Sequence, residues 1–136
     1  MNKIKIFKLD VKFNPKGNIV KLLEASKINK FGELYISNIQ KKKIKGWKLH
    51  SKMNMNLFVL SGKIKFVFFN QVNKKFRIII TSASDKKRIF VRKNTWFAFQ
   101  NISNINAQIL NFADVKHSVK ESKNVDLNFF KYNWKK

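Results

Sequence analysis

Residues 44–62 read IKGWKLHSKMNMNLFVLSG, which predicts two strands joined by a short polar turn and ended by a Ser-Gly pair. Side chains alternate between the two faces of a strand, so Trp47 and Leu49 share one face while Lys48 and His50 share the other. If Trp47 and Leu49 pack on the outside of a sheet, Lys48 and His50 project into the space that the sheet encloses. A Lys and a His that enter one cavity together indicate a chemical site.

The rest of the chain also predicts β-structure. Short alternating segments recur at near-regular spacing with turn residues between them, at Lys3 to Phe13, Gly17 to Glu24, Glu33 to Ile39, Lys63 to Phe69, Phe76 to Ser82, Arg88 to Arg92, Thr95 to Gln100 and Ala107 to Phe112. Ser26 to Lys30 is predicted to be a polar loop, while the aromatic segment from Val125 to Trp134 is left unassigned. No long stretch has helical periodicity, so we expect one all-β domain over residues 1–136, a sandwich or barrel.

The chain has 30 Lys and Arg residues against 7 Asp and Glu residues, a formal net charge of +23. One interpretation is nucleic-acid binding, since a basic face neutralises phosphates. However, nearly all the cations are Lys, they are scattered through every segment, and no recognised nucleic-acid module is visible. The compositional bias of an AT-rich genome, or a smaller anionic ligand, accounts for the charge equally well. Nucleic acid is therefore the less favoured partner.

Hydrophobic residues make up 44% of the chain, which is typical of a folded protein, and there is no cysteine. A disulfide or a thiolate metal site is therefore excluded. The first ten residues alternate Lys with Ile and Phe and lack the continuous apolar run of a signal peptide, and no segment approaches membrane-spanning length. We expect a cytoplasmic protein with no membrane contact.

The spacing of residues 44–62 resembles the first motif of the cupin barrel, in which two His residues and a Glu bind a metal and a Gly follows. Lys48 stands at the place of the first His, His50 at the second, Met55 at the Glu and Gly62 at the Gly. In the segment that matches the second motif, Trp96 stands where the remaining His ligand belongs. An ammonium, a thioether and an indole do not replace these ligands. The resemblance thus implies a cupin jelly-roll barrel with no metal and no other cofactor.

Several segments together resemble the small cupins related to dTDP-4-dehydrorhamnose 3,5-epimerase. They are Trp47–Leu49 with His50, Leu57 to Val67, Trp96 to Phe99, Asn111 to Asp114 with His117 and Glu121, and Tyr132 to Trp134. The short chain is also similar to the dTDP-sugar 3,4-ketoisomerases. The resemblance covers roughly Gly17 to Trp134. It implies a metal-independent isomerase of surface-polysaccharide biosynthesis that binds a nucleoside-diphosphate 4-keto sugar, and a homodimer paired through strands.

The chemistry of such a substrate assigns roles to residues. A C–H bond beside a ketone yields its proton to a side-chain base when the enolate oxygen is stabilised. His50 is the expected base, Lys48 is expected to hold the enolate or the diphosphate, and Tyr35 is a candidate acid. The expected substrate-binding residues are Trp96, which offers a ring face at the cavity wall, with Lys52, Asn56, Lys65 and Asn111.

The catalytic set of neither relative is complete in this chain. Lys48 stands where the epimerases have their catalytic His, Met55 where they have a Lys, and Leu110 near the place of their Tyr. The first His of the ketoisomerase pair is missing. Two alternatives therefore stay open: a different proton transfer that uses His50, and a non-catalytic cupin that binds a nucleotide sugar or another anion. His117, beside Asp114, is expected to have a structural role.

Overall fold

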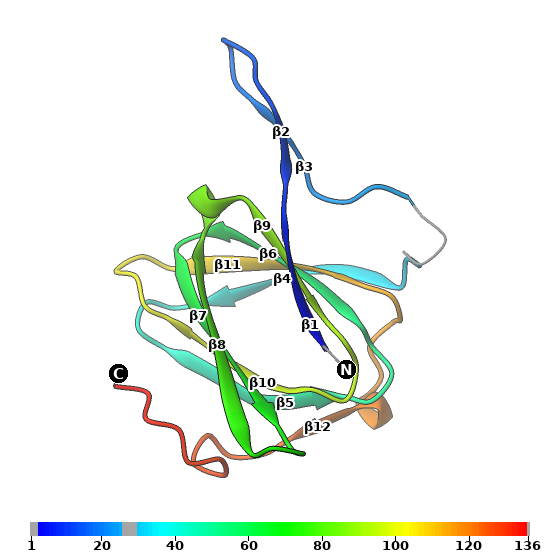
Figure 1. Ribbon diagram of the computed structural model, residues 1–136, viewed down its shortest axis with the longest axis vertical. Coiled ribbons are helices and arrows are strands. Elements are labelled where there is room, and N and C mark those ends of the chain that lie inside the picture. The colour runs from blue at the N-terminus through cyan, green and yellow to red at the C-terminus, as the bar shows by residue number, and fades with distance from the viewer. Residues whose placement is uncertain (1–2, 26–29, 136) are drawn as a thin grey trace.

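The structure is a computed structural model that describes residues 3–25 and 30–135 (Figure 1). In these ranges the chain forms strands and two 3-10 turns, and contains no helix long and apolar enough to cross a membrane. The strands are β1 (Ile4–Lys8), β2 (Asp10–Lys12), β3 (Ile19–Lys21), β4 (Glu33–Ile39), β5 (Ile44–His50), β6 (Met55–Ser61), β7 (Lys63–Asn70), β8 (Lys75–Ser82), β9 (Lys87–Val91), β10 (Trp96–Asn101), β11 (Ala107–Ala113) and β12 (Ser122–Asn124). The all-β prediction is confirmed.

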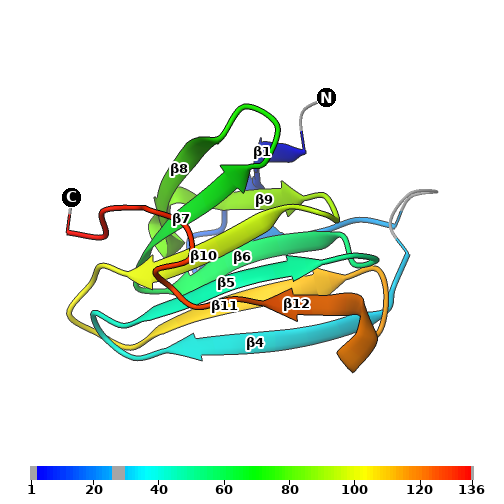
Figure 2. The ribbon, with the colours of Figure 1, turned by 90° about the horizontal axis from the view of Figure 1, so that it is seen from below.

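Two five-stranded antiparallel sheets face each other as a sandwich (Figure 2). One sheet has the strand order β1-β9-β6-β11-β4, and the other has the order β12-β5-β10-β7-β8. Strand β4 ends the first sheet, while β5 lies one strand from the end of the second. Inward side chains of β4, β5 and β11 therefore meet near the same edge of the sandwich, where the candidate site lies.

The main core fills the space between the sheets. On strand β7 the two-residue alternation places Ile64, Phe66 and Phe68 on one face. All three are buried in this core, as the alternation predicts. Strand β6 contributes Met55 and Leu57 from the opposite sheet. Close packing of these large side chains excludes water and holds the two sheets at a fixed separation.

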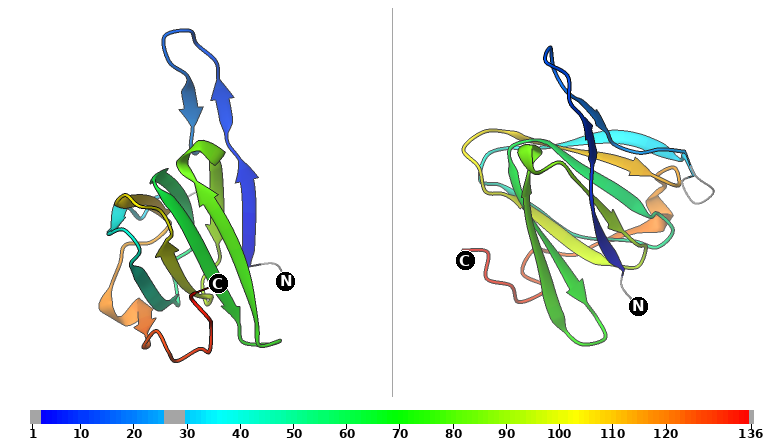
Figure 3. Two further views of the ribbon diagram at one scale, coloured as in Figure 1. Left: turned by 90° about the vertical axis from the view of Figure 1, so that its left-hand side faces the viewer. Right: turned by 45° about the horizontal axis from the view of Figure 1, so that its top comes forward.

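The N-terminal segment differs from the prediction of one strand from Lys3 to Phe13. The segment breaks at Leu9 into β1, which pairs with β9, and β2, which pairs with β3 in a hairpin that projects from the sandwich (Figures 1 and 3). The predicted turn over residues 14–17 is present, and the Gly17 N–H donates to the Asn14 carbonyl. The predicted second strand shortens to β3, and residues 26–29 of the predicted polar loop lie outside the described residues.

The C-terminal segment, left unassigned from the sequence, runs after β12 without regular structure along the outer face of the second sheet (Figure 1). Phe130 packs there in a cluster with Trp47 and Trp96. The indole N–H of Trp47 donates to the Leu127 carbonyl at 2.9 Å, and Trp47 and Val125 exchange two backbone hydrogen bonds. The chain end thus holds the outer side of β5, the strand that carries Lys48 and His50.

Candidate active site

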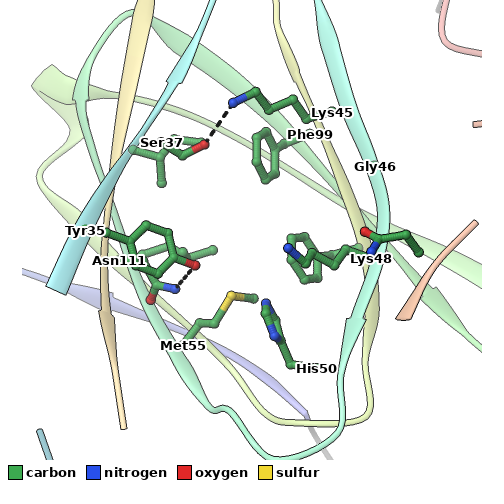
Figure 4. A pocket seen from close by; sticks show the side chains of 13 residues that line it. Tyr35, Ser37, Lys45, Gly46, Lys48, His50, Met55, Phe99 and Asn111 are labelled. Atoms are coloured by element: carbon green, nitrogen blue, oxygen red, sulfur yellow. Dashed lines mark hydrogen bonds between the residues drawn. The ribbon is translucent and has the colours of Figure 1, made fainter. Parts of the chain in front are cut away.

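A cavity of about 310 Å³ lies between the sheets and is lined mainly from β4, β5, β6, β10 and β11 (Figure 4). Its lining runs from exposed Lys45 to buried His50. The lining residues are Tyr35, Ser37, Lys45, Gly46, Lys48, His50, Met55, Leu57, Phe97, Phe99, Ile109, Asn111 and Asn124. The cavity therefore combines an apolar wall with a few polar groups, as small-molecule sites do.

His50 ends β5 and enters the cavity beside Lys48, as the alternation predicted (Figure 4). Its Nδ1 atom hydrogen-bonds to Oε1 of Glu121, and both side chains are buried. Burial lowers the pKa of His50 below its ordinary value of 6.5, and the hydrogen bond and charge of Glu121 offset part of that effect. In a neutral His50 the Nδ1–H donates this hydrogen bond to the Glu121 carboxylate, so Nε2 keeps a lone pair for the cavity.

The backbone around Glu121 fixes this pair. The Ser51 N–H and hydroxyl both donate to the Glu121 carbonyl, at 2.6 Å and 2.8 Å, and β12, which follows directly, pairs with the end of β5. The Lys52 N–H lies 3.4 Å from Glu121 Oε2. On the cavity side, the ring of Phe97 stacks on the imidazole with centroids 5.8 Å apart. His50 is thus held from both sides in one orientation.

Tyr35 and Asn111 face Lys48 and His50 across the cavity (Figure 4). They are paired residues on β4 and β11, and the Asn111 Nδ2 atom donates to the Tyr35 hydroxyl oxygen at 2.8 Å. Burial raises the pKa of Tyr35 above its ordinary 10.0, and the hydrogen bond from Asn111 offsets part of the rise. Tyr35 therefore stays protonated at neutral pH and is able to donate a proton opposite a basic His50.

Two cationic side chains line the same cavity. Lys45 lies at its exposed end, where its Nζ atom donates to the Ser37 hydroxyl at 3.3 Å. Lys48 is half-buried and lies nearer to His50. The cavity thus offers one cation near solvent and a second beside the candidate base, an arrangement that suits an elongated anionic ligand.

Four predicted substrate-binding residues lie away from this cavity. Trp96 packs on the outer face against Phe130, which corrects the expectation that it forms a cavity wall. The buried Lys65 lies outside too, 5.4 Å from the ring centroid of Tyr132. Asn56 accepts a hydrogen bond from Arg88, and the Lys52 side chain is exposed in the turn between β5 and β6. Among the predicted substrate-binding residues, Asn111 alone lines the cavity.

Sequence reasoning missed the role of Glu121, although it is one of only 7 acidic residues. Its neighbour His117 has Nδ1 3.6 Å from Glu121 Oε1, and its backbone N–H donates to Glu33. Together His50, His117 and Glu121 are of metal-ligand type and lie close to one another. This group lies on the side of the imidazole away from the cavity. On the cavity side, His50 is accompanied by Lys48, Met55 and Phe97, which are not metal ligands of the cupin type. The absence of a metal stays a prediction.

The sequence matches the family described as "FdtA: WxcM-like, C-terminal" over residues 2–133. The chain belongs to this family. No curated protein sequence matched the chain.

Solved structures of nucleotide-sugar enzymes have the same fold. A dTDP sugar isomerase from Desulfovibrio desulfuricans G20 is 21% identical with a TM-score of 0.86, over 97% of this chain and 90% of that one. A mutant of the 3,4-ketoisomerase QdtA from Thermoanaerobacterium thermosaccharolyticum, in complex with TDP-4-keto-6-deoxyglucose, is 14% identical with a TM-score of 0.76, over 90% and 88%. The 3,5-epimerase RmlC from Legionella pneumophila Philadelphia 1 is 15% identical with a TM-score of 0.81, over 94% and 75%. The predicted cupin fold is confirmed.

Proposed function

We propose that this member of the family is a nucleotide-sugar isomerase that moves a proton next to the ketone of a nucleoside-diphosphate 4-keto-6-deoxy sugar without a metal. The observation that carries the proposal is the placement of His50 and Tyr35 on opposite walls of one cavity, with the pKa of His50 lowered and that of Tyr35 raised. A base and an acid whose pKa values are moved apart are the pair that proton transfer at neutral pH requires.

The first step breaks the C3–H bond of the sugar. Nε2 of His50 takes the proton, the electron pair forms the C3–C4 double bond, and the ketone oxygen O4 takes a proton from Tyr35. Lys48, two residues from His50 on the same strand, stabilises the charge that develops on O4. The apolar side chains of Met55, Leu57 and Phe97 in the wall strengthen this electrostatic effect by excluding water.

The second step completes the isomerisation. The O3–H proton passes to Tyr35 and replaces the one that it gave to O4, while protonated His50 returns its proton to C4. The products are a ketone at C3 and a hydroxyl at C4, and His50 and Tyr35 recover their starting states. One base and one acid are sufficient because the two reacting carbons are neighbours.

The lysines support an anionic substrate. Lys45 lies where the cavity meets solvent, and we place the diphosphate there, with the sugar ring further in, beside Lys48. A nucleoside diphosphate carries its charge in one compact group, which a lysine at the end of a cavity attracts. Nucleic acid is a weaker candidate, because the cavity lies between the sheets and encloses a small ligand.

The adjacent-carbon reaction is favoured over 3,5-epimerisation by the extent of the structural matches. The chain covers 88% of the 3,4-ketoisomerase chain, but 75% of the 3,5-epimerase chain. The test is incubation with dTDP-4-keto-6-deoxyglucose in heavy water, followed by NMR. A ketone carbon that moves from C4 to C3 supports the proposal, deuterium at both C3 and C5 indicates a 3,5-epimerase, and binding with neither change indicates a non-catalytic cupin.

We also propose that the protein is a homodimer. Apolar side chains are exposed on the projecting hairpin and on the outer face of the first sheet, namely Val11, Phe13, Ile19, Leu34 and Ile36. Burial of these side chains against a second copy would remove them from water. Light scattering is expected to give twice the mass of the chain, and a monomer at micromolar concentration contradicts this proposal.

A further inference from the structure

The two ends of the cavity differ in chemical character (Figure 4). At the exposed end, Lys45 Nζ donates to the Ser37 hydroxyl at 3.3 Å. At the opposite end lie His50 and Met55, which are both buried, and the Met55 side chain extends from its strand towards the imidazole. Tyr35 lies between the two ends. The cavity therefore runs from a polar, cationic entrance to an interior where the candidate base faces a thioether.

The strand register explains why Met55 reaches the inner end. On β11, Asn111 pairs with Leu57 of β6, and Ala113, two residues further, pairs with Met55. Side chains two residues apart point to the same face of a strand, so Leu57 lines the wall beside Asn111 and Met55 lines the next level inward. Ala113 has only a methyl group and does not line the cavity. The long side chain of Met55 therefore fills this level alone on its sheet.

The side chains that line the inner end beside His50 offer a ligand no strong hydrogen-bonding partner in the described part of the chain. Leu57 and Phe97 are apolar, and the Met55 sulfur accepts hydrogen bonds weakly and donates none. The nearest amide, on Asn111, already donates its Nδ2 proton to Tyr35. A hydroxyl placed at this end would lose its hydrogen bonds to water without replacement, whereas a methyl group would fit.

We propose that Met55 is a specificity-determining residue that selects the C6 methyl group of a 6-deoxy sugar against a C6 hydroxymethyl group. This inference rests on the proposed function. With the diphosphate on C1 at the exposed end, C4 lies innermost, between its ring neighbours C3 and C5. His50 takes the proton from C3, so C5 and its C6 substituent face the opposite sheet. That sheet carries Met55 and Leu57.

The test compares kcat/KM for dTDP-4-keto-6-deoxyglucose with that for dTDP-4-ketoglucose, which differs only by a hydroxyl on C6. The wild type should prefer the 6-deoxy substrate by about 10- to 100-fold. Met55→Gln keeps the length of the side chain but supplies a donor and an acceptor, and should reduce this preference to about 5-fold or less. Met55→Leu, which stays apolar, should keep the preference. A purely structural role of Met55 would change both rates together and leave their ratio unchanged.

Leu60→Gln is the matched control, because Leu60 lies on the same strand, is 39% exposed and does not line the cavity. This variant should keep the wild-type preference. Circular dichroism checks the fold of each variant. If Met55→Gln does not fold, Met55→Thr replaces it, since Thr suits a strand and also brings a hydroxyl.

Each outcome decides the inference. Equal kcat/KM of the wild type for the two substrates overturns it and leaves the proposed function intact. A preference that survives in the folded polar variant, or is lost in Met55→Leu, also overturns it. If the wild type converts neither substrate, the proposed function fails, and the inference fails with it.

Discussion

The imidazole of His50 hydrogen-bonds through Nδ1 to the buried carboxylate of Glu121, which lies 71 residues further along the chain. Water does not replace this hydrogen bond for either side chain, since His50 is 3% exposed and Glu121 is 1% exposed. The contact leaves Nε2 as the ring nitrogen available to the cavity. It makes the C-terminal part of the chain a determinant of the orientation of His50 on β5.

Substitution of Glu121 by Gln should slow turnover without preventing binding. The amide keeps the shape of the side chain but loses the charge that holds the Nδ1 proton and stabilises the imidazolium. We expect the rate of ketone transfer to fall about 10- to 100-fold, with the affinity for dTDP unchanged. Glu24→Gln is the control, since Glu24 forms an exposed ion pair with Lys21. A Glu121→Gln enzyme of full activity would show that the contact is structural.

The dependence of the rate on pH should follow the two perturbed groups. Burial lowers the pKa of His50 below 6.5, so the neutral base is present above that pKa and is lost as the pH falls through it. The pKa of Tyr35 lies above 10.0, so the acid stays protonated across neutral pH. We expect kcat/KM to be level near neutrality and to fall on the acid side with a midpoint below 6.5. A midpoint above 6.5 contradicts the assignment of His50, and Tyr35→Phe should lower the rate without moving this acid limb.

Gly46 allows β5 to pass close to β10 and should not accept a side chain. Its φ is +152°, and a Cβ atom there would lie 2.2 Å from the Cβ of Ala98. Gly46→Ala should lower the free energy of unfolding by about 2–4 kcal/mol, measured by denaturant titration. Gly17→Ala separates the cost of backbone strain from the cost of a steric collision. Gly17 also has a positive φ, +136°, but a Cβ atom there would have no atom within 4 Å. Equal losses in the two variants would show that the collision costs nothing.

Phe130 should anchor the C-terminal segment to the outer face of the second sheet. Its ring lies 4.3 Å from that of Phe69 and 5.2 Å from that of Trp47, measured between centroids. Phe130→Ala should lower the free energy of unfolding by about 3–4 kcal/mol. Phe129→Ala, at a neighbouring ring that is 64% exposed, should cost under about 1 kcal/mol. Similar costs for both variants would contradict the packing described for the tail.

The sequence was sufficient to predict the sheet structure and the inward direction of Lys48 and His50. Alternation on β5 places both on the cavity side, and this follows from the two-residue period of a strand. The same period explains why two of the predicted substrate-binding residues lie away from the cavity. Asn56 alternates with Met55 and Leu57, and Lys65 alternates with Ile64 and Phe66, so both point away from the core that their neighbours fill.

Trp96 lies on the outer face because side chains alternate along β10, so a difference of one residue decides which face a side chain takes. In the structure Trp96 pairs with Leu49 on the outer side, and its neighbour Phe97, which pairs with Lys48, lines the cavity. Glu121 could not be placed because its position depends on β12, a strand of three residues with no alternation to detect. Long-range pairing of such a short strand is decided by tertiary packing, which local sequence patterns do not encode.

The most direct test of the central claim is the conversion of dTDP-4-keto-6-deoxyglucose by the wild type and by His50→Ala, followed by carbon NMR of the ketone. His117→Asn is the control, because His117 is the other of the 2 histidines and does not line the cavity. We expect the wild type and His117→Asn to move the ketone from C4 to C3, while His50→Ala binds dTDP normally and leaves the ketone at C4. Conversion by His50→Ala at the wild-type rate would contradict the claim that His50 is the base.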